Sequence, residues 1–305
     1  MSHAAIPNPT NIPDFAEGSA NMTSTVSTAA TAAAPRTRSF QGKQTFMRAV
    51  RSEWIKIWTL RSTWISAALT VLITAGFGGL LTALAADPDF MGMEEPGAML
   101  NVGTYFGMIV VAVLGTMSIT GEYSSGQIRS SLTAVPGRLR LLSAKVLVST
   151  TVGFLLGSVS IFLAWLISLP FLGDKTISLA DSHYSGLIWG TGLSYAIIVL
   201  MSMGLGFLLR STAGSITIVT VLLFVINLPL SIAAAFWEWP TKVMGFLPST
   251  VFYSVADPME LNVGWDNTSE MSTYFLEHWQ ATLVFCAWGL IPLLIGAIVF
   301  SRRNA

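Results

Sequence analysis

Six long apolar segments without a charged side chain constrain this chain more than any other feature of its sequence. Each has 20 to 27 residues, and none contains Asp, Glu, Lys, Arg or His. A helix of about 20 apolar residues crosses the ~30 Å hydrocarbon core of a bilayer. Because lipid offers the backbone no hydrogen-bond partner, each segment must be helical. The predicted spans are about 64–86, 100–119, 146–172, 187–209, 214–236 and 279–300.

Composition indicates the same class of protein. Only 10% of the residues are charged and 52% are hydrophobic, whereas about a quarter of a typical soluble protein is charged. We therefore expect an all-α polytopic membrane protein whose single membrane domain occupies residues 64–303. One cysteine cannot form an internal disulfide, and the three scattered histidines do not indicate a metal site.

Basic residues are distributed unevenly among the loops. With the amino terminus in the cytoplasm, 14 of the 16 Lys and Arg residues lie on the cytoplasmic side, and 12 of the 16 acidic residues lie outside. Basic residues are retained on the cytoplasmic side of a membrane protein. The pattern predicts a multi-pass protein of the cell (cytoplasmic) membrane with both termini inside.

Two different segments precede the first span. Residues 1–39, rich in Ala, Ser, Thr and Pro, are predicted to form a disordered cytoplasmic tail, because they contain too little apolar surface to offset their ordering entropy. Residues 40–63 predict an amphipathic interfacial helix with tryptophans on its apolar side and basic residues near lipid headgroups. A solvated helix packed on another domain is the alternative. The apolar positions are Phe46, Val50, Trp54, Ile57 and Trp58, and the basic positions are Arg48, Arg51, Lys56 and Arg61.

Aromatic, glycine and proline residues mark three further features. The longest predicted outer loop, 237–278, holds eight aromatic residues, so part of it is expected to lie at or dip into the outer interface. Small residues four apart allow helices to approach closely. Prolines within spans predict either hinges or static kinks. The glycine pairs are Gly153 with Gly157 and Gly186 with Gly190, and the prolines are Pro229 and Pro292.

The chain lacks the motifs of an energy-converting enzyme. It has no GxxxxGK[ST] phosphate loop, no HExxH sequence, and no ionisable group at mid-membrane that would serve a proton- or sodium-coupled carrier. We expect no catalytic residue, metal or cofactor in this chain, and nothing in it indicates a nucleic-acid partner. If it moves a solute uphill, the energy must come from another protein.

The stretch between spans two and three, residues 121–145, is short and basic. Ser124 or Ser125 can cap a helix over residues 127–134, which Pro136 and Gly137 would end. Ile128, Leu132 and Val135 would then share one face, with Arg129 and Thr133 on another. An amphipathic helix parallel to the membrane would suit a lever on which a partner acts. A plain positive-inside loop explains the same composition.

Two segments of the chain resemble the permease subunits of type 2 ABC transporters, the exporter-like class. ITGEYSSGQIRSSLTAVPGRLRLLSAKVL is similar to the cytoplasmic loop between spans two and three of that family, and RSEWIKIWTLRSTW to its entry helix. The resemblance covers residues 46–303 and leaves the amino-terminal tail unexplained. The matching residues are Glu122, Gly126, Leu132, Pro136, Arg138 and Lys145 in the first segment, and Glu53, Trp54, Lys56, Arg61, Ser62 and Trp64 in the second.

The resemblance implies an ATP-driven exporter in which this chain is the non-catalytic permease. Two copies of a cytoplasmic ATPase would bind ATP and Mg and push on a coupling helix, and a second permease chain, identical or different, would complete the membrane unit. A path without charged side chains favours amphipathic drug-like or lipid-like substrates. The alternatives are a non-transporting membrane sensor or scaffold that recruits a cytoplasmic partner, and a channel.

The same resemblance assigns roles to three sets of residues. In the family, the acidic residue of the loop holds it against the ATPase or the entry helix, so Glu122 is expected to pair with Arg51, Lys56 or Arg61. For the path-lining set, plain packing between helices is an equal alternative. The coupling set is Glu122, Gly126, Ile128, Arg129, Leu132, Pro136 and Arg138; the entry-helix set is Glu53, Trp54, Lys56 and Arg61; the path-lining set is Asn101, Thr104, Tyr105, Thr116, Thr217, Thr220, Phe224 and Asn227.

Overall fold

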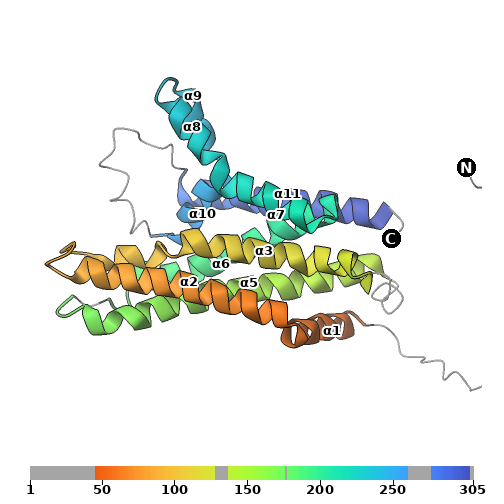
Figure 1. Ribbon diagram of the computed structural model, residues 1–305, viewed down its shortest axis with the longest axis horizontal. Coiled ribbons are helices and arrows are strands. Elements are labelled where there is room, and N and C mark those ends of the chain that lie inside the picture. Colours follow the sequence, from red (N-terminus) through yellow and green to blue (C-terminus); the bar gives the residue numbers. More distant parts are fainter. Residues whose placement is uncertain (1–44, 128–136, 176, 260–275, 303–305) are drawn as a thin grey trace, which may run out of the picture. The chain divides into compact units, whose positions relative to one another are not determined.

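The computed structural model of the chain describes residues 45–127, 137–175, 177–259 and 276–302 (Figure 1). All regular secondary structure in these ranges is helical. The predicted tail, residues 1–39, lies outside the described residues, as do residues 128–136, which include most of the predicted coupling helix. The α-helices are α1 (Phe46–Thr59), α2 (Arg61–Ala86), α3 (Thr104–Ser124), α5 (Arg138–Ser168), α6 (Ser182–Leu209), α7 (Thr212–Thr220), α8 (Asn227–Ala234), α9 (Trp239–Met244), α10 (Pro248–Ala256) and α11 (His278–Arg302).

Six helical stretches of the described residues are long and apolar enough to cross a membrane, which confirms the predicted polytopic all-α fold. Several extend beyond the apolar segments that predicted them: α3 continues to Ser124 and α5 begins at Arg138. Helical hydrogen bonding continues through polar residues at the membrane surface, so a span predicted from hydropathy alone is too short. The stretches are Arg61–Ala86, Pro96–Ser124, Arg138–Phe171, Ser182–Leu209, Thr212–Ala234 and His278–Ser301.

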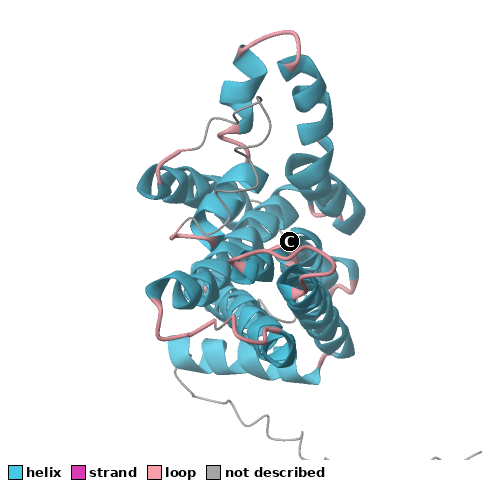
Figure 2. Cartoon of the chain, turned by 90° about the vertical axis from the view of Figure 1, so that its left-hand side faces the viewer, coloured by secondary structure: helices cyan, strands magenta, loops and turns pink. Residues whose placement is uncertain are grey.

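Helix α6 is the centre of the membrane domain. It packs against α3, α5, α10 and α11, while α2 packs against α3 and α5. Most of α6 is buried within the chain, whereas the fifth span is the least buried of the six. In Figure 1, α8 and α9 project away from the other helices. In Figure 2, which views the spans nearly end-on, α1 lies crosswise to them.

Both predicted glycine pairs lie at close contacts. A Cβ added to Gly157 on α5 would come 2.7 Å from the carbonyl oxygen of Thr191 and 2.9 Å from Cα of Gly192, both on α6. A Cβ on Gly190 would come 2.7 Å from two carbonyl oxygens of α10. The prediction of close approach is confirmed, although the second pair faces α10 and the turn after it and not another full span.

The fifth span is divided into three pieces. Between α7 and α8 lies a π-helical turn, Val221–Val225, in which the amide of Ile226 donates to the carbonyl of Val221 at 3.0 Å. Pro229 follows within α8, and a proline ring conflicts with the carbonyl four residues earlier, here that of Val225. A π turn relieves such a conflict by widening the helix. In contrast, Pro292 lies inside the continuous helix α11.

The outer loop predicted at 237–278 contains two helices in its described part. Helix α10 is packed into the core against α6 and α11, with Val251, Phe252 and Val255 almost completely buried. Two hydrogen bonds connect this segment to α11. Trp288 Nε1 donates to the carbonyl oxygen of Phe246 at 2.9 Å. His278 Nδ1 lies 2.9 Å from the carbonyl oxygen of Ser254. This part of the loop therefore belongs to the membrane domain. Residues 260–275 lie outside the described part.

We expect both termini to be cytoplasmic, because 14 of the 16 basic residues lie on that side in this orientation. A reporter that is active only in the cytoplasm, fused after Arg303, should be active. A reporter that is active only outside, fused at the same position, should be silent. The opposite result would overturn the six-span topology.

Candidate functional site

Four charged side chains from three helices meet in the interior of the structure. Glu53 and Lys56 come from α1, Glu122 from the last turn of α3, and Lys145 from the beginning of α5. Glu53, Glu122 and Lys145 are only 4%, 7% and 6% exposed. An isolated buried charge costs several kcal/mol, so charges this deep require partners. We refer to these four residues as the charge cluster.

Each lysine of the charge cluster bridges both carboxylates. Lys145 Nζ lies 2.6 Å from Glu53 Oε2 and 2.8 Å from Glu122 Oε1. Lys56 Nζ lies 2.7 Å from Glu53 Oε1 and 2.8 Å from Glu122 Oε1. The four groups form a closed ring of opposite charges with no net charge, and this arrangement compensates their burial.

Helical spacing explains how α1 supplies two members of the cluster. Glu53 and Lys56 are three residues apart and therefore share a face. Ala49, one turn earlier on that face, is small and packs against Leu141 and Ala144 of α5, so α1 approaches α5 closely. The charged pair thus points into the protein, while Trp54 on the other side is exposed.

This orientation corrects the expected assignment of faces on the entry helix. Lys56 was expected near lipid headgroups, together with the other basic residues, and Val50 and Ile57 on the same side as the tryptophans. Instead Lys56 faces the protein, and Val50 and Ile57 are half-buried on that side. The two carboxylates that Lys56 meets there offset the cost of removing its ammonium group from water.

Lys56 remains charged over the physiological pH range. Burial alone would lower its pKa, but the hydrogen bonds to Glu122 and Glu53 and the negative charges of these carboxylates together outweigh that effect and raise the pKa above its ordinary value of 10.5. A raised pKa means that the contribution of this group to stability is fully present below its unfolded-state pKa. That contribution is lost only as the pH rises through the higher folded-state value. Lys56 therefore keeps its charge, and with it this contribution to stability, at neutral pH.

The expected partner of Glu122 is confirmed in part. Of the three basic residues proposed for it, Lys56 makes the ion pair, whereas Arg51 and Arg61 are exposed. Sequence reasoning missed Lys145 as the second partner, although Lys145 belongs to the same motif. A signal was present: Arg138, Leu141 and Lys145 follow one another at helical spacing, so Lys145 extends the protein-facing side of α5.

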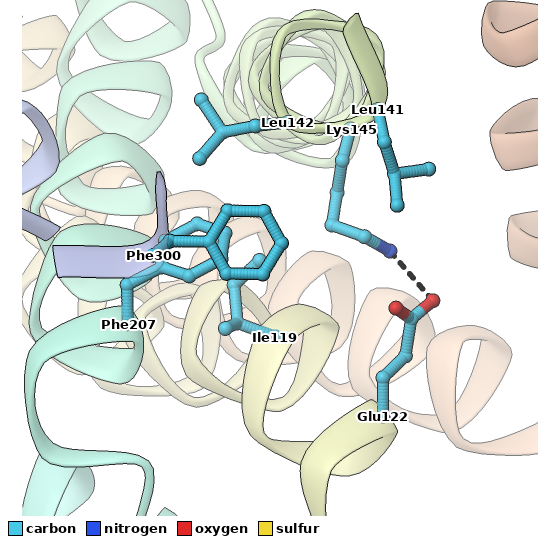
Figure 3. Close-up of a pocket in the computed structure, with 7 residues that line it drawn as sticks. All are labelled: Ile119, Glu122, Leu141, Leu142, Lys145, Phe207 and Phe300. Atoms are coloured by element: carbon cyan, nitrogen blue, oxygen red, sulfur yellow. Dashed lines mark hydrogen bonds and ion pairs between the residues drawn. The ribbon is translucent and has the colours of Figure 1, made fainter. Parts of the chain in front are cut away.

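A small cavity lies beside the charge cluster (Figure 3). Its volume of about 10 Å³ is too small for a transported solute. Within the described part of the chain, Glu122 Oε2 is buried without a hydrogen-bond partner. The lining residues come from α3, α5, α6 and α11, so four spans converge at this point. They are Ile119, Glu122, Leu141, Leu142, Lys145, Phe207 and Phe300.

Two further residues of the coupling set have clear structural roles. Gly126 has a positive φ of 71°, the left-handed conformation that commonly ends a helix and that glycine adopts without strain. It therefore ends α3 just after Glu122. Arg138, the first residue of α5, donates through Nη1 to the carbonyls of Phe300 and Ser301 in the last turn of α11, both at 3.3 Å. A cation is favourable at a helix C-terminus, so Arg138 ties α5 to the end of α11.

We expect Arg138→Gln to loosen the end of α11 by about 1 kcal/mol, because the change removes a charged donor from two helix-terminal carbonyls. Hydrogen exchange of residues 298–302 should become faster in the variant. Arg140→Gln is the matched control, since it removes an exposed charge from the same turn. Equal exchange in both variants would contradict the capping role.

The residues of the path-lining set fall into two groups. Asn101, Thr104 and Thr116 are at most 1% exposed, and Thr104 Oγ1 donates to the carbonyl of Asn101 at 2.6 Å; this placement fits the alternative of packing between helices. The other residues lie at or near the surface of the chain. Tyr105 and Phe224 make an edge-to-face contact at 5.0 Å, and Asn227 Nδ2 donates to Ser249 Oγ at 2.9 Å. Those other residues are Tyr105, Thr217, Thr220, Phe224 and Asn227.

The middle of the predicted coupling helix is outside the described residues, so its faces remain a prediction. This applies to Ile128, Arg129, Leu132 and Pro136. The site is therefore built on the two ends of the segment, where Glu122 precedes it and Arg138 and Lys145 follow it.

Comparison with known proteins identifies the family of the chain. Residues 47–305 match the family described as ABC-2 family transporter protein. No curated protein matches the chain. The match begins within α1 and continues through α11, so it includes every member of the charge cluster. The chain therefore belongs to the ABC-2 transporter family, as a membrane-spanning permease subunit.

Proposed function

We propose that this permease exports amphipathic drug-like or lipid-like substrates and that the charge cluster transmits the force of a separate ATPase to its spans. The observation that carries the proposal is the ring of four ion pairs. It joins α1 to α3 immediately before the coupling segment, residues 125–137, and to α5 immediately after it. A plain connecting loop would not require such a buried ring at both of its ends.

The geometry supports force transmission because the connections between the helices are short, buried ion pairs that are costly to break. Removing one partner of a buried ion pair typically costs 3–5 kcal/mol, since the other charge is left uncompensated. A push on the coupling segment would therefore move α3, α5 and α1 together. Arg138 extends the connection to α11 through the carbonyls of Phe300 and Ser301. Four helices would respond to one displacement.

The composition of the spans supports the proposed substrate class. No charged residue lies in the apolar segments, so a path between the spans offers nothing to compensate a strongly ionic solute. The surface where α3 meets the fifth span carries the aromatic residues Tyr105 and Phe224. Aromatic and apolar contacts of this kind suit amphipathic molecules. Export as the direction rests on the resemblance to the exporter-like class.

The partners in this proposal are two copies of a cytoplasmic ATPase, which bind ATP and Mg, and a second permease chain that is either identical or different. We expect the purified chain alone to hydrolyse no ATP, because it contains no phosphate loop. Co-purified with its ATPase, it should show hydrolysis that a transported substrate stimulates. Persistent hydrolysis by the chain alone, after contaminating ATPases are removed, would contradict the proposal.

Leu132→Asp tests the coupling helix within the same complex. Leu132 lies on the predicted apolar face, so a carboxylate there should reduce the amount of ATPase that co-purifies. Arg140→Ala is the control, since it removes an exposed charge from the first turn of α5 and leaves Arg138 in place. Normal ATPase recovery and normal transport with Leu132→Asp would show that the stretch is only a loop. Normal recovery without transport of any substrate would favour the scaffold alternative.

A further inference from the structure

The face of α1 opposite the charge cluster is exposed and has an unusual composition. Five residues at helical spacing lie on it, and three of them are large apolar side chains with more than half of their surface exposed: Met47 at 73%, Ile55 at 51% and Trp58 at 55%. The only acidic residue of α1, Glu53, points the other way. The face consists of Met47, Arg51, Trp54, Ile55 and Trp58.

Three tryptophans extend this face across the corner between α1 and α2. Trp54 and Trp58 have ring centroids 6.4 Å apart, and Trp58 and Trp64 5.0 Å apart in an edge-to-face contact. Trp64 Nε1 also donates to the carbonyl of Trp58 at 3.1 Å. Because Trp64 belongs to the first span, the aromatic surface continues directly into a membrane-spanning helix. Tryptophan is enriched at the membrane interface.

Two arginines lie beside the tryptophans. Arg51 shares the exposed face of α1 and Arg61 begins α2; both side chains are exposed. Neither takes part in the ion pairs between described residues. A guanidinium group binds phosphate through paired hydrogen bonds. The corner therefore combines donors for a phosphate with aromatic and aliphatic surface for acyl chains.

From this surface we infer that the corner of α1 and α2 is a binding site for an anionic phospholipid. The phosphate of the lipid would lie at Arg51 and Arg61. The parts of its acyl chains nearest the headgroup would pack against Trp54, Trp58 and Trp64. A lipid fits better than a soluble protein because the surface is continuous with exposed apolar side chains of the first span, Ile65, Leu69 and Leu72. A soluble protein covering the whole corner would have to extend into the bilayer.

Lipid at this site would hold α1 from the side opposite the charge cluster. Glu53 and Lys56 lie on the inner face of the same helix. A lipid that holds α1 against α5 would therefore also maintain their ion pairs with Lys145 and Glu122. This consequence rests on the proposed function. The inferred binding site itself does not depend on the proposed function.

The test measures lipid binding by the full-length chain without ATPase or transport. The purified chain in detergent is titrated with dioleoyl phosphatidylglycerol or dioleoyl phosphatidylcholine, and bound lipid is counted by native mass spectrometry. The wild type should bind the anionic lipid roughly 30-fold more tightly, since each basic side chain near an anionic surface contributes about a factor of five. Arg51→Gln with Arg61→Gln should remove most of this preference. Trp58→Ala should weaken binding of both lipids.

Arg140→Gln with Lys242→Gln is the matched control, because it also removes two basic charges but none from the corner. It should keep the preference for the anionic lipid. Equal affinity of the wild type for the two lipids, or an unchanged preference in the Arg51 and Arg61 variant, would overturn the inference. Thermal unfolding without added lipid checks that both double variants are folded. Because the readout is lipid binding, a negative result leaves the proposed function standing, and loss of transport elsewhere leaves this site standing.

Discussion

Replacing Glu122 with glutamine is expected to abolish most ATP-driven transport while the six spans still insert. Glutamine keeps a carbonyl oxygen but removes the negative charge, so the ring of the charge cluster holds two lysines and only Glu53. Lys145, 6% exposed, is then short of a compensating charge. Loss of one partner from a buried ion pair should lower the free energy of unfolding by about 3 kcal/mol. Reconstituted transport and thermal unfolding of the same preparation measure the two effects.

A second substitution separates the charge balance from the loss of a particular side chain. In Glu122→Gln with Lys56→Gln, the pair of Lys145 with Glu53 at 2.6 Å remains, and the cluster is neutral again. The double variant should therefore be more stable than Glu122→Gln alone, with a coupling energy of about 1–3 kcal/mol. Glu94→Gln, at an exposed acidic position, is the control and should change neither quantity. If Glu122→Gln transports normally, the cluster does not transmit force.

Gly157→Leu is expected to prevent correct assembly of the membrane domain. A Cβ at this position would come 2.7 Å from the carbonyl oxygen of Thr191 and 2.9 Å from Cα of Gly192. Both are backbone atoms of α6, so neither can rotate away, and α5 would have to shift. Overpacking typically costs 1–3 kcal/mol even where side chains can adjust, and we expect more than about 3 kcal/mol here.

Gly76→Leu is the matched control for this change. A Cβ on Gly76 of α2 meets nothing within 4 Å, so the leucine would extend away from the described helices. The control should elute as a single species in detergent and unfold near the wild-type temperature, whereas Gly157→Leu should aggregate or unfold much earlier. Wild-type stability of Gly157→Leu would mean that α5 and α6 do not pack as the structure shows.

The sequence by itself determined the parts of this protein that depend on local composition. Six segments without charge must be helices in lipid, because the bilayer leaves the backbone no other way to satisfy its hydrogen bonds. Glycines four apart indicated close helix contacts, and Gly157 and Gly190 lie at such contacts. The position of Glu122 in a basic loop indicated that it needs a partner, and Lys56 is one.

Only the tertiary structure decided which side chains face one another. In a membrane protein, apolar residues face lipid as readily as they face another helix, so the apolar pattern of α1 could not reveal that its tryptophans point outward and Lys56 inward. Likewise, Lys145 becomes a partner of Glu53 and Glu122 only because α1, α3 and α5 meet, and Asn101 accepts a hydrogen bond from Thr191 only because α6 passes beside it. Burial and pairing of charges are properties of several helices together, and a sequence read one segment at a time does not contain them.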